Sequence, residues 1–190
     1  LLRIMEIKTN RILVTSFASN VARMESVFYC AKKTGRNICL VGRSMQRIYK
    51  AAKKCGYLQG LIEPLDPRDA KKVAKNKILY LATGSQGEVD SGLSQLSKGS
   101  HRFVELESGD TVIFSSRTIP GNEMAVQSLC KRFRDTGLNV FHADESSLVL
   151  HASGHPCKEE LETMYRLINP RVEFKDRLRI LKFMLMKSLN

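Results

Sequence analysis

Short apolar segments alternate with segments of helical periodicity along most of this chain. The apolar segments, which favour β-strands, are residues 11–16, 37–42, 78–82, 111–114, 139–141 and 148–150. Helical spacing of apolar residues and helix-stopping glycines mark five intervening or following segments: 20–34, 44–55, 90–97, 122–136 and 157–168. Strands without polar alternation are typical of parallel sheets that are covered on both sides. The order predicts a Rossmann-like α/β fold, with a mostly parallel sheet and helices on both faces.

The chain shows no feature of a membrane or secreted protein. No apolar run approaches the roughly 18 residues that a membrane helix needs, and residues 1–6 do not resemble a signal peptide. The five cysteines are odd in number, contain no C-x-x-C motif and fit neither a disulfide framework nor a zinc site. We therefore expect a cytoplasmic protein with no membrane partner, in which Cys30, Cys39 and Cys130 are buried thiols.

The charge balance is strongly basic. Lys and Arg number 31 against 19 Asp and Glu, which gives a net charge of +12. Such a chain attracts polyanions, of which nucleic acid is the commonest. The alternative is a basic surface without one particular ligand, and the charge alone does not decide between them.

Polar loops follow the predicted strands, and the carboxyl ends of parallel strands meet at one edge of a sheet. These loops are residues 15–20, 41–44, 82–88, 115–122 and 152–155. Several lead directly into predicted helices, where backbone N–H groups can bind a phosphate. Taken singly, each loop is explained by helix capping and tight turns. Taken together in a basic chain, the five loops predict an anion-binding edge.

Two common phosphate-binding motifs are absent. The sequence has neither a G-x-G-x-x-G after a strand nor a G-x-x-x-x-G-K-[ST], which disfavours an independent nucleotide-dependent enzyme. His155 follows a predicted loop and precedes a helix, so it could transfer a proton, contact a phosphate or merely cap the turn. Only four histidines occur, without an H-x-H-x-D-H cluster, so we expect no metal site in this chain.

Six loop motifs occur in a specific order. They are F-A-S-N at 17–20, V-G-R-S-M at 41–45, T-G-S-Q-G-E at 83–88, G-D-T-V-I-F-S at 109–115, I-P-G-N-E at 119–123 and S-G-H at 153–155. The set closely resembles the β-CASP region of the ribonuclease J family, which are RNases of the metallo-β-lactamase fold. The resemblance covers roughly residues 10–170, and T-G-S-Q-G-E followed by I-P-G-N-E is its most specific part.

The resemblance implies a fold, an activity and a set of site residues. In that family a β-CASP domain is inserted into a metallo-β-lactamase domain that holds two zinc ions, and RNA lies between the two domains. The enzymes are 5′-to-3′ exonucleases and endonucleases that prefer a 5′-monophosphate. His155 matches the family's catalytic S-G-H position. The residues implied to contact RNA or its phosphates are Ser19, Asn20, Arg23, Arg43, Ser44, Gly84, Ser85, Gln86, Gly87, Asn122 and Ser153.

Two departures from the family limit the activity that we expect. The family's zinc-binding and acidic motifs are absent, and the H-G-E motif expected after residue 170 is replaced by a basic amphipathic tail at 171–190, which is helical or disordered. We therefore expect a β-CASP-like α/β domain at 1–170 that binds RNA and is catalytically incomplete alone. This chain would hold no cofactor, since zinc is expected only with the lactamase domain.

The sequence leaves the enzymatic status and the partners open. The leading partners are RNA and a chain that carries the metallo-β-lactamase domain, and a homo-oligomer stays possible. The alternative function is a non-catalytic module that docks on a partner nuclease or an RNA-decay complex. For the tail, covering exposed surface or disorder is favoured over a role at a membrane surface.

Overall fold

The computed structural model describes residues 1–143, 145, 149–152 and 156–168. The chain divides into two compact units, Leu1–His151 and Ala152–Asn190. The predicted tail at 171–190 lies outside the described residues, as do Ser153 and His155. The predicted domain boundary at residue 170 therefore stays a prediction.

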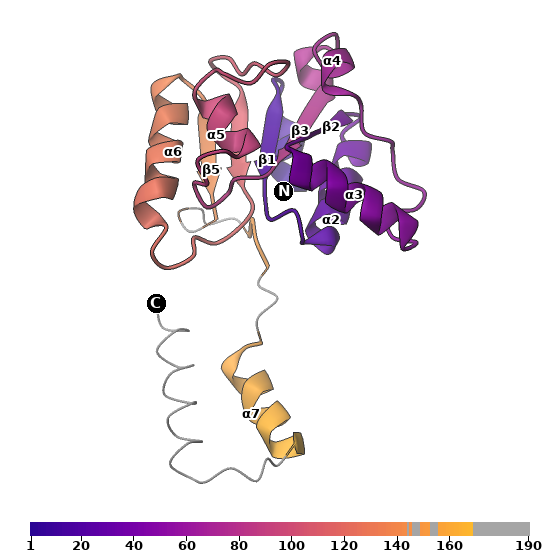
Figure 1. The fold of residues 1–190 in the computed structure, drawn as a ribbon, viewed down its shortest axis with the longest axis vertical. Coiled ribbons are helices and arrows are strands. Elements are labelled where there is room, and N and C mark those ends of the chain that lie inside the picture. Colours follow the sequence, from indigo (N-terminus) through magenta and orange to yellow (C-terminus); the bar gives the residue numbers. More distant parts are fainter. Residues whose placement is uncertain (144, 146–148, 153–155, 169–190) are drawn as a thin grey trace. The chain divides into compact units, whose positions relative to one another are not determined.

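A five-stranded parallel sheet forms the centre of the first unit (Figure 1). Its strands are β1 (Ile12–Thr15), β2 (Asn37–Val41), β3 (Ile78–Ala82), β4 (Thr111–Phe114) and β5 (Asn139–His142). They lie in the order β2-β3-β1-β4-β5, and every neighbouring pair is parallel. All residues of β1, β3 and β4 are buried, as expected for apolar runs covered on both faces. The predicted α/β fold class is confirmed.

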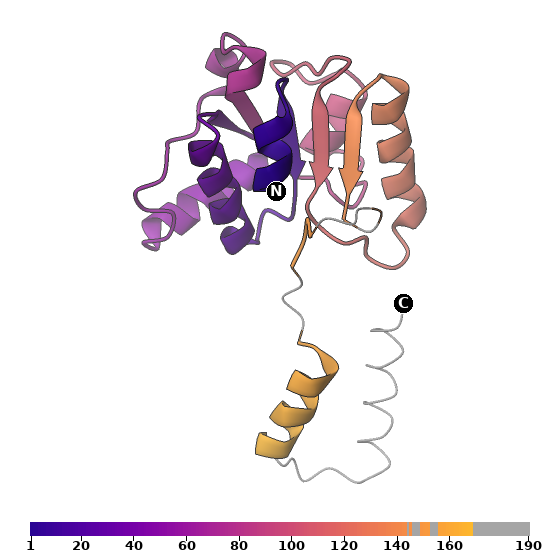
Figure 2. The ribbon, with the colours of Figure 1, turned by 180° about the vertical axis from the view of Figure 1, so that it is seen from behind.

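Helices cover both faces of this sheet, because alternate residues of each strand point to opposite sides. Ile12 and Val14 belong to one apolar cluster with helices α1 (Leu2–Ile7), α2 (Val21–Lys33) and α3 (Arg43–Lys54). Leu13 belongs to a second cluster with helices α4 (Pro67–Ala70), α5 (Gly92–Ser97) and α6 (Glu123–Asp135). Figure 2 shows α1 on the face opposite to α5 and α6.

The structure departs from the predicted elements at three places. Helix α1 was not predicted, because six residues are too few for a periodicity, yet Ile4 and Met5 are buried. Residues 57–77, for which no helix was predicted, contain α4 and a 3₁₀ turn at Lys75–Lys77. Of the strand predicted at 148–150, residues 149 and 150 are described and form no strand.

The second unit contributes one described helix, α7 (Lys158–Ile168), which confirms the helix predicted at 157–168. None of the helices in the described ranges is long and apolar enough to cross a membrane. The three cysteines predicted to be buried are so, and burial raises the pKa of Cys39 to about 12.

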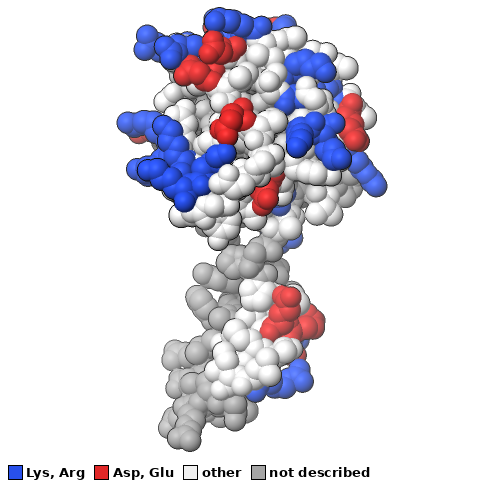
Figure 3. All heavy atoms as spheres, turned by 90° about the vertical axis from the view of Figure 1, so that its right-hand side faces the viewer, with Lys and Arg blue, Asp and Glu red and all other residues white. Residues whose placement is uncertain are grey.

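Basic side chains form clusters on the surface of the first unit. Figure 3 shows Lys and Arg gathered on the side that carries α3, with Asp and Glu between the clusters. The helices that cover the sheet thus carry these basic side chains at the surface.

Candidate functional site

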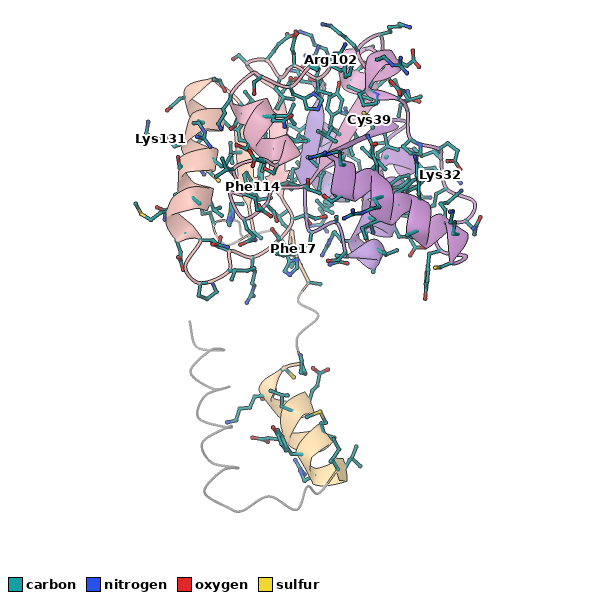
Figure 4. All side chains as sticks on the ribbon, viewed as in Figure 1. Phe17, Lys32, Cys39, Arg102, Phe114 and Lys131 are labelled. Atoms are coloured by element: carbon teal, nitrogen blue, oxygen red, sulfur yellow. The ribbon has the colours of Figure 1, made fainter. Side chains whose placement is uncertain are left out.

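The carboxyl ends of the strands meet at one edge of the sheet, as the parallel order requires. Phe17, which follows β1, marks this edge in Figure 4. The loops after β1, β2, β3 and β4 all begin here, and these loops together with the first turns of the helices that follow them hold ten of the twelve predicted site residues. The other two, Ser153 and His155, lie outside the described residues.

Gln86 joins the loop after β3 to the loop after β4. Its side-chain Nε2 donates a hydrogen bond to the Arg117 carbonyl oxygen at 3.0 Å. Its Oε1 accepts hydrogen bonds from the Ile119 backbone N–H at 2.8 Å and from Asn122 Nδ2 at 3.4 Å. Because Gln86 is only 6% exposed, its amide serves to hold the second loop in place. The structure thereby brings together two predicted site residues, Gln86 and Asn122.

Two glycines of the loop after β3 are required by close packing. Gly84 has φ +111°, and a Cβ there would lie 2.1 Å from Ser91 Oγ, at the start of α5. Gly87 has φ +82°, and a Cβ there would lie 2.5 Å from the Ala125 Cβ of α6. These glycines let the loop approach the N-terminal turns of two helices, so its shape is fixed by neighbours.

The loop after β2 packs against the loop after β3. Gly42 has φ +105°, and a Cβ there would lie 2.6 Å from Thr83 Oγ1. Helix α3 begins at the next residue, which places Arg43 and Ser44 beside the loop after β3. Arg43 is exposed, and no acidic side chain among the described residues pairs with it.

The loop after β1 contributes a helix cap and a cation. The Asn20 Oδ1 accepts a hydrogen bond from the Arg23 backbone N–H at 2.9 Å, so Asn20 caps α2. The Arg23 side chain is half-buried, and burial lowers the pKa of its guanidinium. In the described part of the chain this guanidinium has no hydrogen-bonding or ionic partner. A bound anion would offset that desolvation. Ser19, one residue before the cap, is exposed.

Three buried hydroxyls lie at the ends of the three adjacent strands β3, β1 and β4. Within the described residues, the hydroxyls of Thr15, Ser85 and Ser116 have no hydrogen-bonding partner. Most buried polar groups are paired, and unpaired ones cluster where a water or a ligand belongs. The neighbouring Ser115 differs, because its hydroxyl donates to the Leu150 carbonyl oxygen at 2.6 Å. Thr15 and Ser116 were not among the predicted site residues. The sequence signal that could have indicated them is a hydroxyl residue at or just after the end of a predicted strand.

Two histidines also lie at this edge and were not predicted as site residues. His142 ends β5 and is 5% exposed. Its Nε2 lies 3.5 Å from Thr118 Oγ1, and its ring is tilted against Phe114 with centroids 5.3 Å apart. His151 places its Nδ1 3.3 Å from the Ser115 carbonyl oxygen. Both imidazoles help to fix the loop after β4.

Comparison with known proteins decides the family. The family model described as "Ribonuclease J, beta-CASP domain" matches residues 9–133, which include β1 to β4 and every loop built above. The chain belongs to this family. The resemblance drawn from the loop motifs is confirmed, and the β-CASP domain is the α/β unit described above.

Longer relatives that match this chain are named ribonuclease J. Ribonuclease J of Sinorhizobium meliloti is 35% identical over 162 residues, which cover 85% of this chain and 28% of the relative. Ribonuclease J 1 of Streptococcus pyogenes is 37% identical over 174 residues, 90% of this chain and 30% of the relative. Ribonuclease J of Thermus thermophilus is 38% identical over 161 residues, 85% of this chain and 28% of the relative. The chain thus spans less than a third of the relatives it matches.

The described residues do not fit the zinc ions that the family implies. Among them, no group of three or more His, Cys, Asp and Glu side chains could hold a metal ion. The chemistry that these residues offer is hydrogen bonding and positive charge, which are suited to an anionic ligand.

Proposed function

We propose that the chain is the RNA-binding β-CASP portion of a ribonuclease J-like enzyme. The observation that carries the proposal is the match of the family model to all loops of the carboxyl edge up to Asn122. At this edge, Gln86 joins the loops after β3 and β4. Arg23 and Arg43 supply positive charge at this edge without acidic partners among the described residues. The relatives are named ribonucleases, so the ligand proposed for this charge is RNA.

In this proposal the chain binds and orients RNA but is catalytically incomplete alone. Arg23 and Arg43 would hold phosphates, while Gln86 fixes the loop that presents Asn122. Zinc would come with a metallo-β-lactamase domain, whether that domain lies elsewhere in the same protein or in another chain. His155, through its S-G-H match, would then act at the scissile phosphate.

A binding assay tests both parts of the proposal. A labelled 5′-monophosphorylated RNA oligomer and its 5′-hydroxyl twin are titrated across a salt series, with and without zinc, and intact RNA is scored. We expect log K to fall linearly with log salt concentration, as phosphate contacts require, and the RNA to stay intact. Absence of binding at low salt would contradict RNA binding. Zinc-dependent cleavage that is lost in His155→Ala would contradict catalytic incompleteness.

Arginine variants locate the binding to the carboxyl edge. Arg23→Gln and Arg43→Gln should each make the slope of log K against log salt about 0.7 shallower, because each removes one phosphate contact on a single strand. Arg3→Gln is the matched control, since Arg3 is exposed on α1 at a distance in sequence from these loops. Equal effects of all three variants would show that the charge acts without a defined site.

A second candidate function is docking on a chain that carries a metallo-β-lactamase domain. Helix α7 exposes Leu167, Ile168 and Met164, which are 81%, 62% and 41% accessible and line one shallow apolar depression. Contiguous exposed apolar side chains favour burial against another protein. Mixing this chain with the lactamase domain of a ribonuclease J relative tests the docking by sedimentation velocity. A complex that Leu167→Glu disrupts and Lys158→Glu preserves would support it, and two separate species would contradict it.

A further inference from the structure

Helix α3 presents a row of four cations on its surface. Arg43, Arg47, Lys50 and Lys54 follow one another at intervals of four, three and four residues, which places them on one face of the helix. All four are exposed, and together with Gln46 and Ala51 they line one shallow depression. At 1.5 Å per residue this cationic stripe is about 16 Å long.

The cationic stripe is not neutralised by the protein. Helix α3 contains no Asp or Glu, and within the described residues none of the four cations forms an ion pair. Lys53, which is not part of the stripe, differs because it pairs with Glu63 at 2.7 Å. Helix α6 also differs, since Lys131 pairs with Asp135 and Arg134 with Glu145.

Like charges at these spacings destabilise a helix. The stripe therefore costs stability in the free protein, and a polyanion would remove that cost. Figure 3 shows the Lys and Arg clusters on this side of the first unit.

The shape of the stripe favours a linear polyanion over a small one. A single phosphate or nucleotide is bound by groups that converge, whereas these four cations are spread along three turns. The stripe begins at Arg43, at the carboxyl edge, so it continues from the site described above. Three residues beyond Lys54, Tyr57 is 63% exposed. A basic row followed by an exposed aromatic ring is typical of single-stranded nucleic-acid binding, in which bases stack on the ring.

We propose that the α3 stripe is a second RNA-contacting surface, which binds the backbone of single-stranded RNA that extends from the carboxyl edge. This inference rests on the proposed function and adds the direction in which the RNA runs over the domain. RNA long enough to reach Lys54 gains contacts that a short oligomer at the carboxyl edge lacks. Affinity should therefore rise with RNA length.

The test neutralises the stripe without touching Arg43. The triple variant Arg47→Gln, Lys50→Gln, Lys54→Gln is compared in the 190-residue chain with a control triple of equal charge change. The control is Lys98→Gln, Arg102→Gln, Lys131→Gln, three exposed residues at the end of α5, in the loop after α5 and on α6; α5 and α6 cover the other face of the sheet, and Figure 4 labels Arg102 and Lys131. Each protein is titrated with 4-nucleotide and 16-nucleotide single-stranded RNA across a salt series.

For the 16-nucleotide RNA, the stripe variant should bind about 10- to 100-fold more weakly at 0.1 M salt, with a salt slope about 2 shallower. Its binding to the 4-nucleotide RNA should match that of the wild type. The control triple should lose far less affinity for either RNA. Thermal melting should show that the stripe variant is at least as stable as the wild type, since like-charge repulsion is removed.

The remaining outcomes separate the two proposals. Equal losses in the stripe and control triples, with wild-type binding intact, would overturn the stripe and leave the proposed function standing. Absence of RNA binding by the wild type would overturn both.

Polyglutamate tests for an acidic protein as the ligand. Tyr57→Leu should weaken binding to the longer RNA by about five-fold or more through lost stacking. It should not change polyglutamate binding, and tighter binding of polyglutamate than of RNA would overturn the assignment to RNA.

Discussion

The two edges of the sheet satisfy their polar groups in opposite ways. At the amino edge, charged side chains pair with one another and with backbone groups of the protein. At the carboxyl edge, the cations lack acidic partners within the described residues, and three buried hydroxyls lack hydrogen bonds. The amino edge is therefore stabilised by its own ion pairs and hydrogen bonds, whereas the carboxyl edge has polar groups that are available for the proposed ligand.

Asp110 is the centre of the amino edge. It is 1% exposed and accepts hydrogen bonds from the backbone N–H groups of Arg11 and Glu107, at 3.0 and 2.9 Å. The Arg11 guanidinium pairs with Asp110 at 3.4 Å and with Glu107 at 3.1 Å. Nearby, the buried Arg36 guanidinium donates to the carbonyl oxygens of Lys8, Asn10 and Ile78. Burial lowers the pKa of Arg36, and these three carbonyls compensate part of the desolvation.

At the carboxyl edge, a neutral side chain joins the loops after β3 and β4 instead. Gln86 uses its amide to connect two loops, while Arg23 and Arg43 stay available for an anion. Away from the carboxyl edge, two further buried polar atoms of the described residues lack a hydrogen-bonding partner, the Thr111 hydroxyl at the start of β4 and Arg132 Nε on α6. Among the described residues, this domain thus pairs most of its charges at the amino edge, and it leaves polar groups without protein partners at the carboxyl edge, where we propose that RNA binds.

The largest expected effect comes from breaking the amino edge. Asp110→Ala should lower the free energy of unfolding by about 3 kcal/mol, because it leaves Arg11 and two backbone N–H groups without their buried acceptor. Urea denaturation measures the loss. Asp69→Ala is the matched control, since its ion pair with Lys72 is exposed and is worth at most about 0.5 kcal/mol. A loss below about 1 kcal/mol for Asp110→Ala would remove the distinction between the two edges.

Gln86→Ala should have the next largest effect, and it should act on both stability and binding. Three hydrogen bonds are lost, which at about 1 kcal/mol each predicts a loss of about 2–3 kcal/mol. RNA affinity should fall as well, because the loop that carries Asn122 loses its anchor. Gln95→Ala is the control, since Gln95 is exposed on α5. Wild-type RNA affinity in folded Gln86→Ala would contradict the positioning role.

Most of the fold could be predicted because its signals are local. Five apolar runs became the five strands, and the glycines at 35 and 56 follow helices α2 and α3, as a helix stop requires. Helix α1 could not be predicted, because its six residues are stabilised by packing Ile4 and Met5 on the core and not by periodicity. For the same reason the four-residue helix α4 could not be predicted.

The candidate site was predicted as a region more reliably than as a set of contacts. Sequence motifs placed the loops at one edge, and parallel topology guaranteed that they meet. The motifs could not reveal that Ser85 and Gln86 are buried, at 1% and 6% exposure, since side-chain direction in a loop depends on its neighbours. Direct contact of either residue with RNA therefore stays a prediction, whereas the structure gives Gln86 a demonstrable contact with the next loop.

Ser115 and Ser116, the two serines that follow β4, should differ in their effect on stability, although both effects are smaller than those above. Ser115→Ala should lower stability by about 1 kcal/mol, because it breaks a hydrogen bond and leaves the Leu150 carbonyl oxygen without its donor. Ser116→Ala should leave stability unchanged or raise it, because the hydroxyl that it removes is buried without a partner among the described residues. Parallel thermal melts measure both. An equal loss in the two variants would show that the Ser116 hydroxyl is paired, for example by a water.

The smallest effect is the pH dependence of the amino edge. The hydrogen bond from Lys75 and the charge of Arg11 lower the pKa of Glu107 in the folded protein. A folded pKa below the unfolded value means that folding favours the ionised carboxylate. Its contribution is therefore complete above the unfolded pKa of about 4.3 and is lost as the pH falls through the folded pKa. Glu107→Gln should be less stable than the wild type at pH 7, and the difference should shrink below about pH 4. Glu25→Gln is the control, because Glu25 is exposed on α2, and its stability should match that of the wild type. If the stability difference between Glu107→Gln and the wild type persisted unchanged at low pH, Lys75 and Arg11 would not be stabilised by the charge of the carboxylate.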